Sequence, residues 1–195
     1  MKVVLIDYGA GNIQSLKFAL ERLNVKATLS ADKNEILEAD RVIFPGVGEA
    51  SSAMKKLKDT GLNLLIPELK QPVLGICLGM QLMCSHSEEG DIHGLGIFEV
   101  PVKRFNSDVK VPQMGWNMLT NIKSALFQNI RDNEYMYLVH SYYAALCKET
   151  IAQTKYGLNY SCALQKDNFY GVQFHPEKSS KAGSQILFNF LNINS

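Results

Sequence analysis

Short apolar runs alternate with amphipathic stretches through the first half of the chain, and this alternation constrains the fold more than any other feature. The runs occupy residues 3–6, 27–29, 41–44 and 72–76. Helical spacing of apolar residues begins at about Asn12 and resumes over residues 50–57. Buried strands that alternate with helices indicate a mainly parallel open sheet with helices on both faces.

The second half of the chain has a different pattern. Strand-like segments follow one another at residues 97–105, 135–140, 160–165 and 170–174. Lys166, Asp167 and Asn168 are typical of a hairpin turn, and residues 183–191 fit a final helix. No linker, repeat or change of composition divides the chain. We therefore expect one α/β domain over residues 1–195, with an antiparallel C-terminal portion.

Charge and cysteine usage exclude several classes of protein. The 195-residue chain has a formal net charge of +1, which does not indicate binding to nucleic acid or to an anionic membrane surface. The N-terminal apolar run is too short for a signal peptide and no stretch approaches the length of a transmembrane helix, so we expect a cytoplasmic enzyme. The four cysteines form no zinc-like cluster, and no metal is expected. Cys84, Cys147 and Cys162 are interpreted as reduced, buried residues.

Cys77 lies between two glycines, Gly75 and Gly79, directly after an apolar run. Small flanking residues are what a nucleophile needs at a tight strand-to-helix turn, because they relieve the crowding around a strained backbone. A helix running from about Leu78 past Cys84 would direct its N-terminal N–H groups and its dipole at the sulfur, which favours the thiolate. These features make Cys77 a candidate nucleophile.

A second motif, at residues 171–177, supplies His175 and Glu177. A histidine can hold a thiolate as an ion pair and later protonate a departing amine. Residues i and i+2 of an extended segment project to the same side, so Glu177 could orient the imidazolium. Alone, the three residues from His175 to Glu177 would more simply be a turn after a strand. Because Cys77 and His175 both follow predicted strands, at the edge where active sites of open sheets collect, we expect all three to meet as a triad.

Two sets of backbone N–H groups could receive the charge of a tetrahedral intermediate. One is the N–H of Leu78 at the predicted helix start. The other belongs to Gly46, Val47 and Gly48, which follow another predicted strand. A tight strand-to-helix connection would need these glycines anyway, so both interpretations of this segment stay open. A dinucleotide fingerprint near the N-terminus fails because position 14 holds Gln14, and no cofactor is expected.

Together these motifs resemble those of the class I, triad-type glutamine amidotransferases, and they span almost the full length of the chain. The general resemblance rests on Pro45-Gly46-Val47-Gly48, Gly75-Ile76-Cys77-Leu78-Gly79-Met80-Gln81 and Val172-Gln173-Phe174-His175-Pro176-Glu177. A narrower resemblance, to the glutaminase subunits of imidazole glycerol phosphate synthase, rests on Asp7-Tyr8-Gly9-Ala10-Gly11-Asn12, Gly94-Leu95-Gly96, Pro112-Gln113-Met114-Gly115-Trp116-Asn117 and Val139-His140-Ser141-Tyr142. The resemblance implies a flavodoxin-like α/β fold.

The resemblance also implies an activity. Cys77 would attack the side-chain amide of glutamine, release ammonia and form a thioester that water hydrolyses. His175 would act as base and acid with Glu177 as its orienter, and backbone N–H groups of Leu78 and of residues 46–48 would bind the oxyanion. The residues implied to hold the amino-acid end of glutamine are Gln81, Ser141 and Tyr142.

A partner is implied as well. In this family the ammonia passes to a cyclase subunit, a (β/α)₈ barrel that forms a heterodimer with the glutaminase. The cyclase makes imidazole glycerol phosphate, for histidine biosynthesis, and an aminoimidazole carboxamide ribonucleotide. The interface candidates are Asn12, Trp116 and Asn117, with Trp116 as the aromatic anchor. A peptide flip at Val47, between two glycines, is the hypothesis for how the partner's ligand state would switch the glutaminase on.

Three alternatives remain at this point. A paralogous glutaminase could feed another ammonia acceptor, such as a surface-sugar amidotransferase. The glutaminase of pyridoxal phosphate synthase is disfavoured by the motifs at residues 7–12 and 112–117. A non-catalytic partner-binding scaffold would be marked by the loss of a triad residue, whereas Cys77, His175 and Glu177 are all present.

Overall fold

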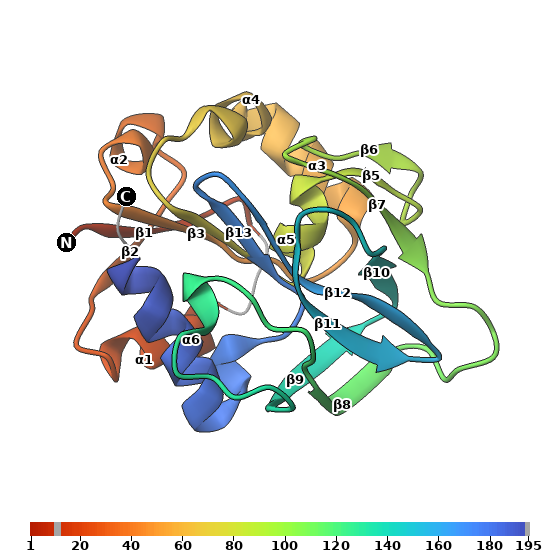
Figure 1. Cartoon of the computed structure of the whole chain (residues 1–195). Helices are drawn as coiled ribbons and strands as arrows, with labels where there is room; N and C mark the ends of the chain where they lie inside the picture. The colour runs from red at the N-terminus through yellow and green to blue at the C-terminus, as the bar shows by residue number, and fades with distance from the viewer. Residues whose placement is uncertain (10–12, 194–195) are drawn as a thin grey trace.

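The computed structural model describes residues 1–9 and 13–193, in which an 11-stranded sheet and a two-stranded ribbon form the frame (Figure 1). Neighbouring strands of the sheet are, in order, β2 (Ala27–Ser30), β1 (Val3–Ile6), β3 (Arg41–Phe44), β4 (Val73–Ile76), β13 (Phe169–Val172), β12 (Leu158–Lys166), β10 (Tyr142–Ala144), β7 (Phe98–Arg104), β5 (Cys84–Ser87) and β6 (Ile92–His93). β11 (Thr150–Tyr156) pairs with β12 outside this path. The ribbon consists of β8 (Gln113–Met118) and β9 (Tyr135–His140).

Helices cover both faces of the parallel half of the sheet. One face carries α1 (Ile13–Glu21) and α6 (Ser180–Asn192). The other carries α2 (Lys33–Leu37), α3 (Ala50–Thr60), α4 (Leu62–Leu65) and α5 (Leu78–Met83). Figure 1 shows α1 and α6 on one side of β1 and β3, with α2 and α4 on the opposite side. Short 3-10 helices are η1 (Ile66–Glu68), η2 (Ala125–Phe127) and η3 (Pro176–Lys178).

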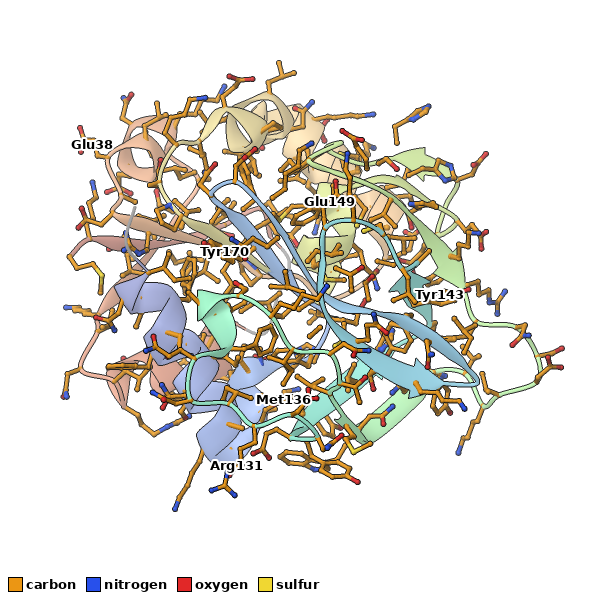
Figure 2. The ribbon with its side chains drawn as sticks, viewed as in Figure 1. Glu38, Arg131, Met136, Tyr143, Glu149 and Tyr170 are labelled. Atoms are coloured by element: carbon orange, nitrogen blue, oxygen red, sulfur yellow. The ribbon has the colours of Figure 1, made fainter. Side chains whose placement is uncertain are left out.

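Side chains of the parallel strands alternate between two apolar cores. In β1, Val3 and Leu5 pack on the side of α1 and α6, whereas Val4 and Ile6 pack on the side of α3. Tyr170 of β13, labelled in Figure 2, belongs to the core beneath α1 and α6. Successive strand residues point to opposite faces, so a strand covered on both faces must be apolar throughout. This burial explains the continuous apolar runs in the sequence.

β13 joins the parallel and antiparallel parts of the sheet. It runs parallel to β4, with Val172 opposite Ile76, and antiparallel to β12, with Val172 opposite Ala163. The predicted hairpin turn before β13 is confirmed, and Asp167 adopts φ +52° in it. The carboxyl ends of β4 and β13 therefore lie side by side, and the residues that follow them begin from adjacent positions.

The predicted architecture, a mainly parallel sheet with helices on both faces and an antiparallel C-terminal portion, is confirmed. Five strands, β5, β6, β8, β10 and β11, are not indicated by the sequence. In β11, for example, Gln153 and Lys155 interrupt the apolar pattern. Some boundaries also differ. β13 ends at Val172 rather than residue 174, and α6 begins at Ser180 rather than residue 183.

The helix that follows Cys77 is shorter than predicted. α5 ends at Met83 and Cys84 opens β5, so the prediction of a helix continuing past Cys84 is wrong. The backbone N–H groups of residues 95–97 donate to the carbonyl groups of residues 82–84 and end the helix there. A neighbouring chain segment thus takes the bonds that a longer helix would have made.

The remaining cysteines agree with the sequence in part. Cys84 and Cys162 are buried, whereas Cys147 is half-buried rather than fully enclosed.

None of the helices in residues 1–9 and 13–193 has the length and apolar character needed to span a bilayer. Within the same residues, no group of three His, Cys, Asp or Glu side chains could hold a metal ion.

Gly79, in the first turn of α5, passes directly beneath the backbone of β3. A Cβ atom at this position would overlap the carbonyl oxygen of Phe44, and the carbonyl carbon lies behind it. Both atoms belong to the backbone of a central strand, so neither can move aside as a flexible side chain would. The close approach fixes α5, and with it the residue that precedes the helix.

We expect Gly79→Ala to lower the free energy of unfolding by about 3 kcal/mol or more, because β3 and α5 must separate to admit the methyl group. Urea unfolding of the purified chain measures this loss. Gly96→Ala is the matched control: it has φ +68° but no atom within 4 Å of the added Cβ. Its backbone strain alone should cost roughly 1–2 kcal/mol. Equal losses in the two variants would contradict the role assigned to close packing.

Candidate active site

Cys77 occupies the strained turn that the sequence predicts. Its backbone has φ +52° and ψ −109°, outside the regions that non-glycine residues ordinarily adopt. Such conformations cost on the order of 1–3 kcal/mol and cluster at functional sites. The Cys77 N–H donates to the carbonyl of Val172 at 2.8 Å, and the Cys77 carbonyl accepts from the N–H of Gln81 at 3.1 Å. The turn is thus held by β13 on one side and by α5 on the other.

His175 and Glu177 come from the segment that follows β13. The N–H of His175 donates to the carbonyl of Tyr137 at 2.9 Å, and its carbonyl accepts from the hydroxyl of Ser179 at 2.6 Å. Nδ1 of His175 lies 2.9 Å from Oε1 of Glu177, and the side chains are only 6% and 4% exposed. Glu177 belongs to η3, so the prediction of an extended segment from His175 to Glu177 is wrong. The carboxylate reaches the imidazole from a helical turn instead.

The surroundings of His175 favour the imidazolium. Burial alone would lower the pKa of His175, but hydrogen bonds to Cys77 and Glu177 and the negative charges of these groups raise it to about 10. A buried cation is stable only beside anions that compensate its lost hydration. The arrangement therefore fits a thiolate–imidazolium pair supported by a carboxylate, with a proton on His175 ready to be given to a leaving group.

A pocket of about 270 Å³ opens beside Cys77. Its lining residues are Gly48, Cys77, Leu78, Gln81, Glu89, Pro112, Val139, His140, Ser141 and Tyr142. Several predicted site residues therefore meet here: the nucleophile, part of the oxyanion set and the residues implied to hold glutamine. Gly46 and Val47 instead line a much smaller cavity, together with His175 and Glu177.

Gln81 is bonded mainly to the protein itself. Its Nε2 donates to the carbonyl of Tyr142 and to Oε1 of Gln173, both at 2.9 Å. Within residues 1–9 and 13–193, no group donates to its Oε1, and Gln81 lines the pocket. The carbonyl of Ser141 accepts from the N–H of Phe105 at 3.1 Å. The segment at Ser141 and Tyr142 therefore lines the pocket with both carbonyl groups already bonded within the chain.

Glu89 is a pocket residue that the sequence does not reveal. One of its carboxylate oxygens accepts from the N–H of Ala50, at the start of α3, at 2.9 Å. Burial raises the pKa of Glu89, and the bond from Ala50 offsets part of that effect. In the sequence Glu89 stands beside Glu88 in a polar stretch, where an acidic pair is most simply a solvated surface. Glu89 follows β5, and the tertiary structure sets it against the start of α3 and in the wall of the pocket.

His140 is a second buried histidine, and its state is opposite to that of His175. Burial lowers the pKa of His140 to about 4, so the imidazole is neutral at pH 7. Nδ1 lies 2.7 Å from the carbonyl of Tyr142, which can only accept, so Nδ1 carries the proton. Nε2 lies 3.0 Å from the hydroxyl of Tyr160. His140 thus holds the backbone of the pocket wall and does not supply acid at neutral pH.

The predicted interface residues differ in their availability. Trp116, on β8, is 52% exposed. Asn117 has both ends of its amide bonded within the chain, since Nδ2 donates to the carbonyl of Lys155 and Oδ1 accepts from the N–H of Met118. Asn12 lies outside the described residues. Of the two that the structure describes, Trp116 is the side chain open to a partner.

Comparison with known proteins gives the family. A family model described as glutamine amidotransferase class-I matches residues 4–193. Imidazole glycerol phosphate synthase subunit HisH of Bacteroides thetaiotaomicron is 54% identical over 196 residues, which cover 99% of this chain and 100% of the relative. The protein of the same name from Pectobacterium atrosepticum is 47% identical with the same coverage. The chain belongs to the class I glutamine amidotransferases, among the HisH subunits.

Solved structures agree with this assignment at the level of the fold. A protein described as a glutamine amidotransferase superposes with a TM-score of 0.75 at 18% identity, covering 96% of each chain. PurLQS from Thermotoga maritima gives a TM-score of 0.69 at 16% identity, covering 98% of this chain and 97% of its own. The amidotransferase fold is thus retained where few residues are shared.

The His175 imidazolium should titrate near pH 10 in the folded chain. Glu177→Gln should move this midpoint to lower pH, because a hydrogen bond and a negative charge that favour the cation are lost. Nitrogen NMR shifts of the histidine rings measure both values. His140 is an internal control and should titrate near pH 4 in either protein. A His175 midpoint near the ordinary value of about 6.5 in the unaltered chain would contradict the ion pair.

Proposed function

We propose that this chain hydrolyses glutamine to glutamate and ammonia, acting over residues 1–195 as one glutaminase domain. The observation that carries the proposal is the buried set of Cys77, His175 and Glu177, opening on a pocket of about 270 Å³. The sulfur would attack the side-chain amide carbon, and His175 would give its proton to the nitrogen that leaves as ammonia. Neutral His175 would then take a proton from water, whose oxygen attacks the thioester and releases glutamate and the thiolate.

The pocket supplies groups for both ends of the substrate. Backbone N–H groups of Leu78 and of residues 46–48 would bind the oxyanion. The free Oε1 of Gln81 and the carboxylate of Glu89 would accept from the ammonium group of glutamine. The hydroxyl of Ser141 and the wall at Tyr142 would hold the remaining end. A carboxylate suits a cationic group, so Glu89 favours a free amino acid over a peptide amide.

We further propose that the ammonia passes to a cyclase subunit, a (β/α)₈ barrel, in a heterodimeric imidazole glycerol phosphate synthase in the cytoplasm. Three large apolar side chains of the β8–β9 ribbon are exposed: Met114, Trp116 and Tyr135. The ribbon also bonds to the catalytic segment through the carbonyl of Tyr137. An exposed apolar surface beside a buried active site suits a partner. Enclosure is needed because ammonia in neutral water is mostly protonated and then has no lone pair with which to attack.

Control by the partner would act on the oxyanion segment. Gly48 has φ +105° with no atom within 4 Å of an added Cβ, so the backbone there is both unusual and uncrowded. A peptide rotation around Val47 could turn an N–H toward the site of the oxyanion. The ligand state of the cyclase would bias that rotation, and the isolated chain would waste little glutamine.

We expect glutamine hydrolysis to be slow in the isolated chain and to rise strongly when the cyclase subunit and its nucleotide ligand are added. Cys77→Ala should reduce the activated rate by at least about 1000-fold, because the nucleophile is lost. Cys147→Ala is the matched control, since it removes a half-buried thiol outside the pocket, and it should leave the rate unchanged. A coupled assay for glutamate measures the hydrolysis rates of the unaltered chain and of both variants.

The alternatives give different results in the same assay. Activity that depends on Cys77 but ignores this cyclase would support a glutaminase that serves another acceptor, such as a surface-sugar amidotransferase. No hydrolysis under any condition would contradict the proposed function and favour a binding scaffold.

Trp116→Ala should weaken the complex with the cyclase by roughly 30-fold or more, as expected for a central aromatic contact. Isothermal titration of the chain with the cyclase measures the dissociation constant. Leu64→Ala is the control, because Leu64 is 75% exposed on α4, at the opposite end of the molecule from the ribbon (Figure 1). Equal affinity of the two variants would place the partner elsewhere.

A further inference from the structure

Gln173 is a fully buried polar residue next to the Cys77 sulfur. It follows β13 directly, and its backbone N–H donates to the carbonyl of Cys162 at 2.8 Å. Its side-chain Nε2 lies 3.6 Å from Sγ of Cys77, a hydrogen-bond distance for sulfur, and its Oε1 lies 2.9 Å from Nε2 of Gln81. Burying an amide is favourable only when its groups are bonded, and here the partners are the nucleophile and a pocket residue.

The direction of each bond is fixed by donors and acceptors. The carbonyl of Tyr142 can only accept, so the amide group of Gln81 that faces it must be the nitrogen. The second N–H of that nitrogen points at Gln173 and needs an oxygen there. The nitrogen of Gln173 must then face Cys77. Reversing the Gln173 amide would set two donors against each other and an oxygen against the sulfur.

We propose that Gln173 is a catalytic residue that donates an amide N–H to the Cys77 sulfur and stabilises the thiolate when it attacks and when it departs, a role that rests on the proposed glutaminase function. Charge-assisted hydrogen bonds are stronger in a site without water. His175 gives its proton to the leaving nitrogen and regains one from water, so its support of the sulfur changes during each of these steps. Gln173 keeps its N–H, and it therefore assists both the attacking thiolate and the thiolate that departs from the thioester.

The same bonds connect the pocket to the nucleophile. Gln81 lines the pocket, and its nitrogen holds the amide of Gln173 in the orientation that presents an N–H to Cys77. The carbonyl of Tyr142, which also accepts from His140, accepts from Gln81 and so fixes the orientation of the Gln81 amide. A ligand that contacts Gln81 is therefore linked through the amide of Gln173 to the Cys77 sulfur.

The test is the pH dependence of Cys77 alkylation by iodoacetamide in the full chain, followed by peptide mass spectrometry so that Cys147 is scored separately. Gln173→Met keeps a similar length without a donor. It should move the alkylation midpoint of Cys77 up by roughly one pH unit, so that the rate falls by roughly tenfold below the original midpoint and is equal at high pH. Gln165→Met is the matched control, because Gln165 donates to the Tyr170 hydroxyl and should leave the profile unchanged.

A second measurement does not require Gln173→Met to fold, because it uses the unaltered chain and Cys77→Ala. The side-chain amide proton of Gln173 in the unaltered chain should shift in NMR spectra at the same pH midpoint as Cys77 alkylation, and this shift should vanish in Cys77→Ala. An unchanged alkylation profile in folded Gln173→Met, or a Gln173 amide that ignores the Cys77 titration, would overturn the proposal.

Neither readout depends on glutamine hydrolysis. If the unaltered chain shows no glutaminase activity but Gln173→Met shifts the alkylation profile, the proposed function is contradicted and the donor role of Gln173 is supported. If the complex carrying Gln173→Met keeps full glutaminase activity and an unaltered alkylation profile, the proposed function is supported and the donor role of Gln173 is contradicted.

Discussion

The parallel pairing of β4 with β13 is the interaction on which the active site depends. It sets Val172 opposite Ile76 and lets the Cys77 N–H donate to the Val172 carbonyl. The nucleophile follows one of these strands, while Gln173 and His175 follow the other. Gln173 and Cys77 are 96 residues apart in the chain, yet they touch because their strands are neighbours. Any shift of register between the two strands would separate the Cys77 sulfur from His175 and Gln173, the residues that stabilise its negative charge.

The charge of the neighbouring groups determines what the two histidines of the site do. Both are removed from water, which by itself disfavours the imidazolium in each. His175 faces a thiol and a carboxylate and is held as a cation. His140 faces a backbone carbonyl and the hydroxyl of Tyr160 and stays neutral. The same residue type therefore serves as the acid in one place and as part of the pocket wall in another, because the neighbours differ in charge.

Sequence reasoning recovers the features with a local cause. Apolar runs identify the parallel strands because those strands are buried on both faces, and the glycines around Cys77 mark a turn that the backbone conformation bears out. It misses features whose cause is distant. α5 stops at Met83 because residues 95–97 take its last carbonyl groups, and β11 has no apolar alternation to reveal it. Glu89 could not be told from an ordinary surface carboxylate.

The sequence alone determined the α/β class, the strained nucleophile turn and the histidine and glutamate that would serve it, because periodicity and turn chemistry act over a few residues. The tertiary structure decided which strand lies beside β4, that Glu177 reaches His175 from η3, and which way the amide of Gln173 points. These depend on groups far apart in the chain. Their arrangement is settled only when the two cores pack and every buried donor must find an acceptor.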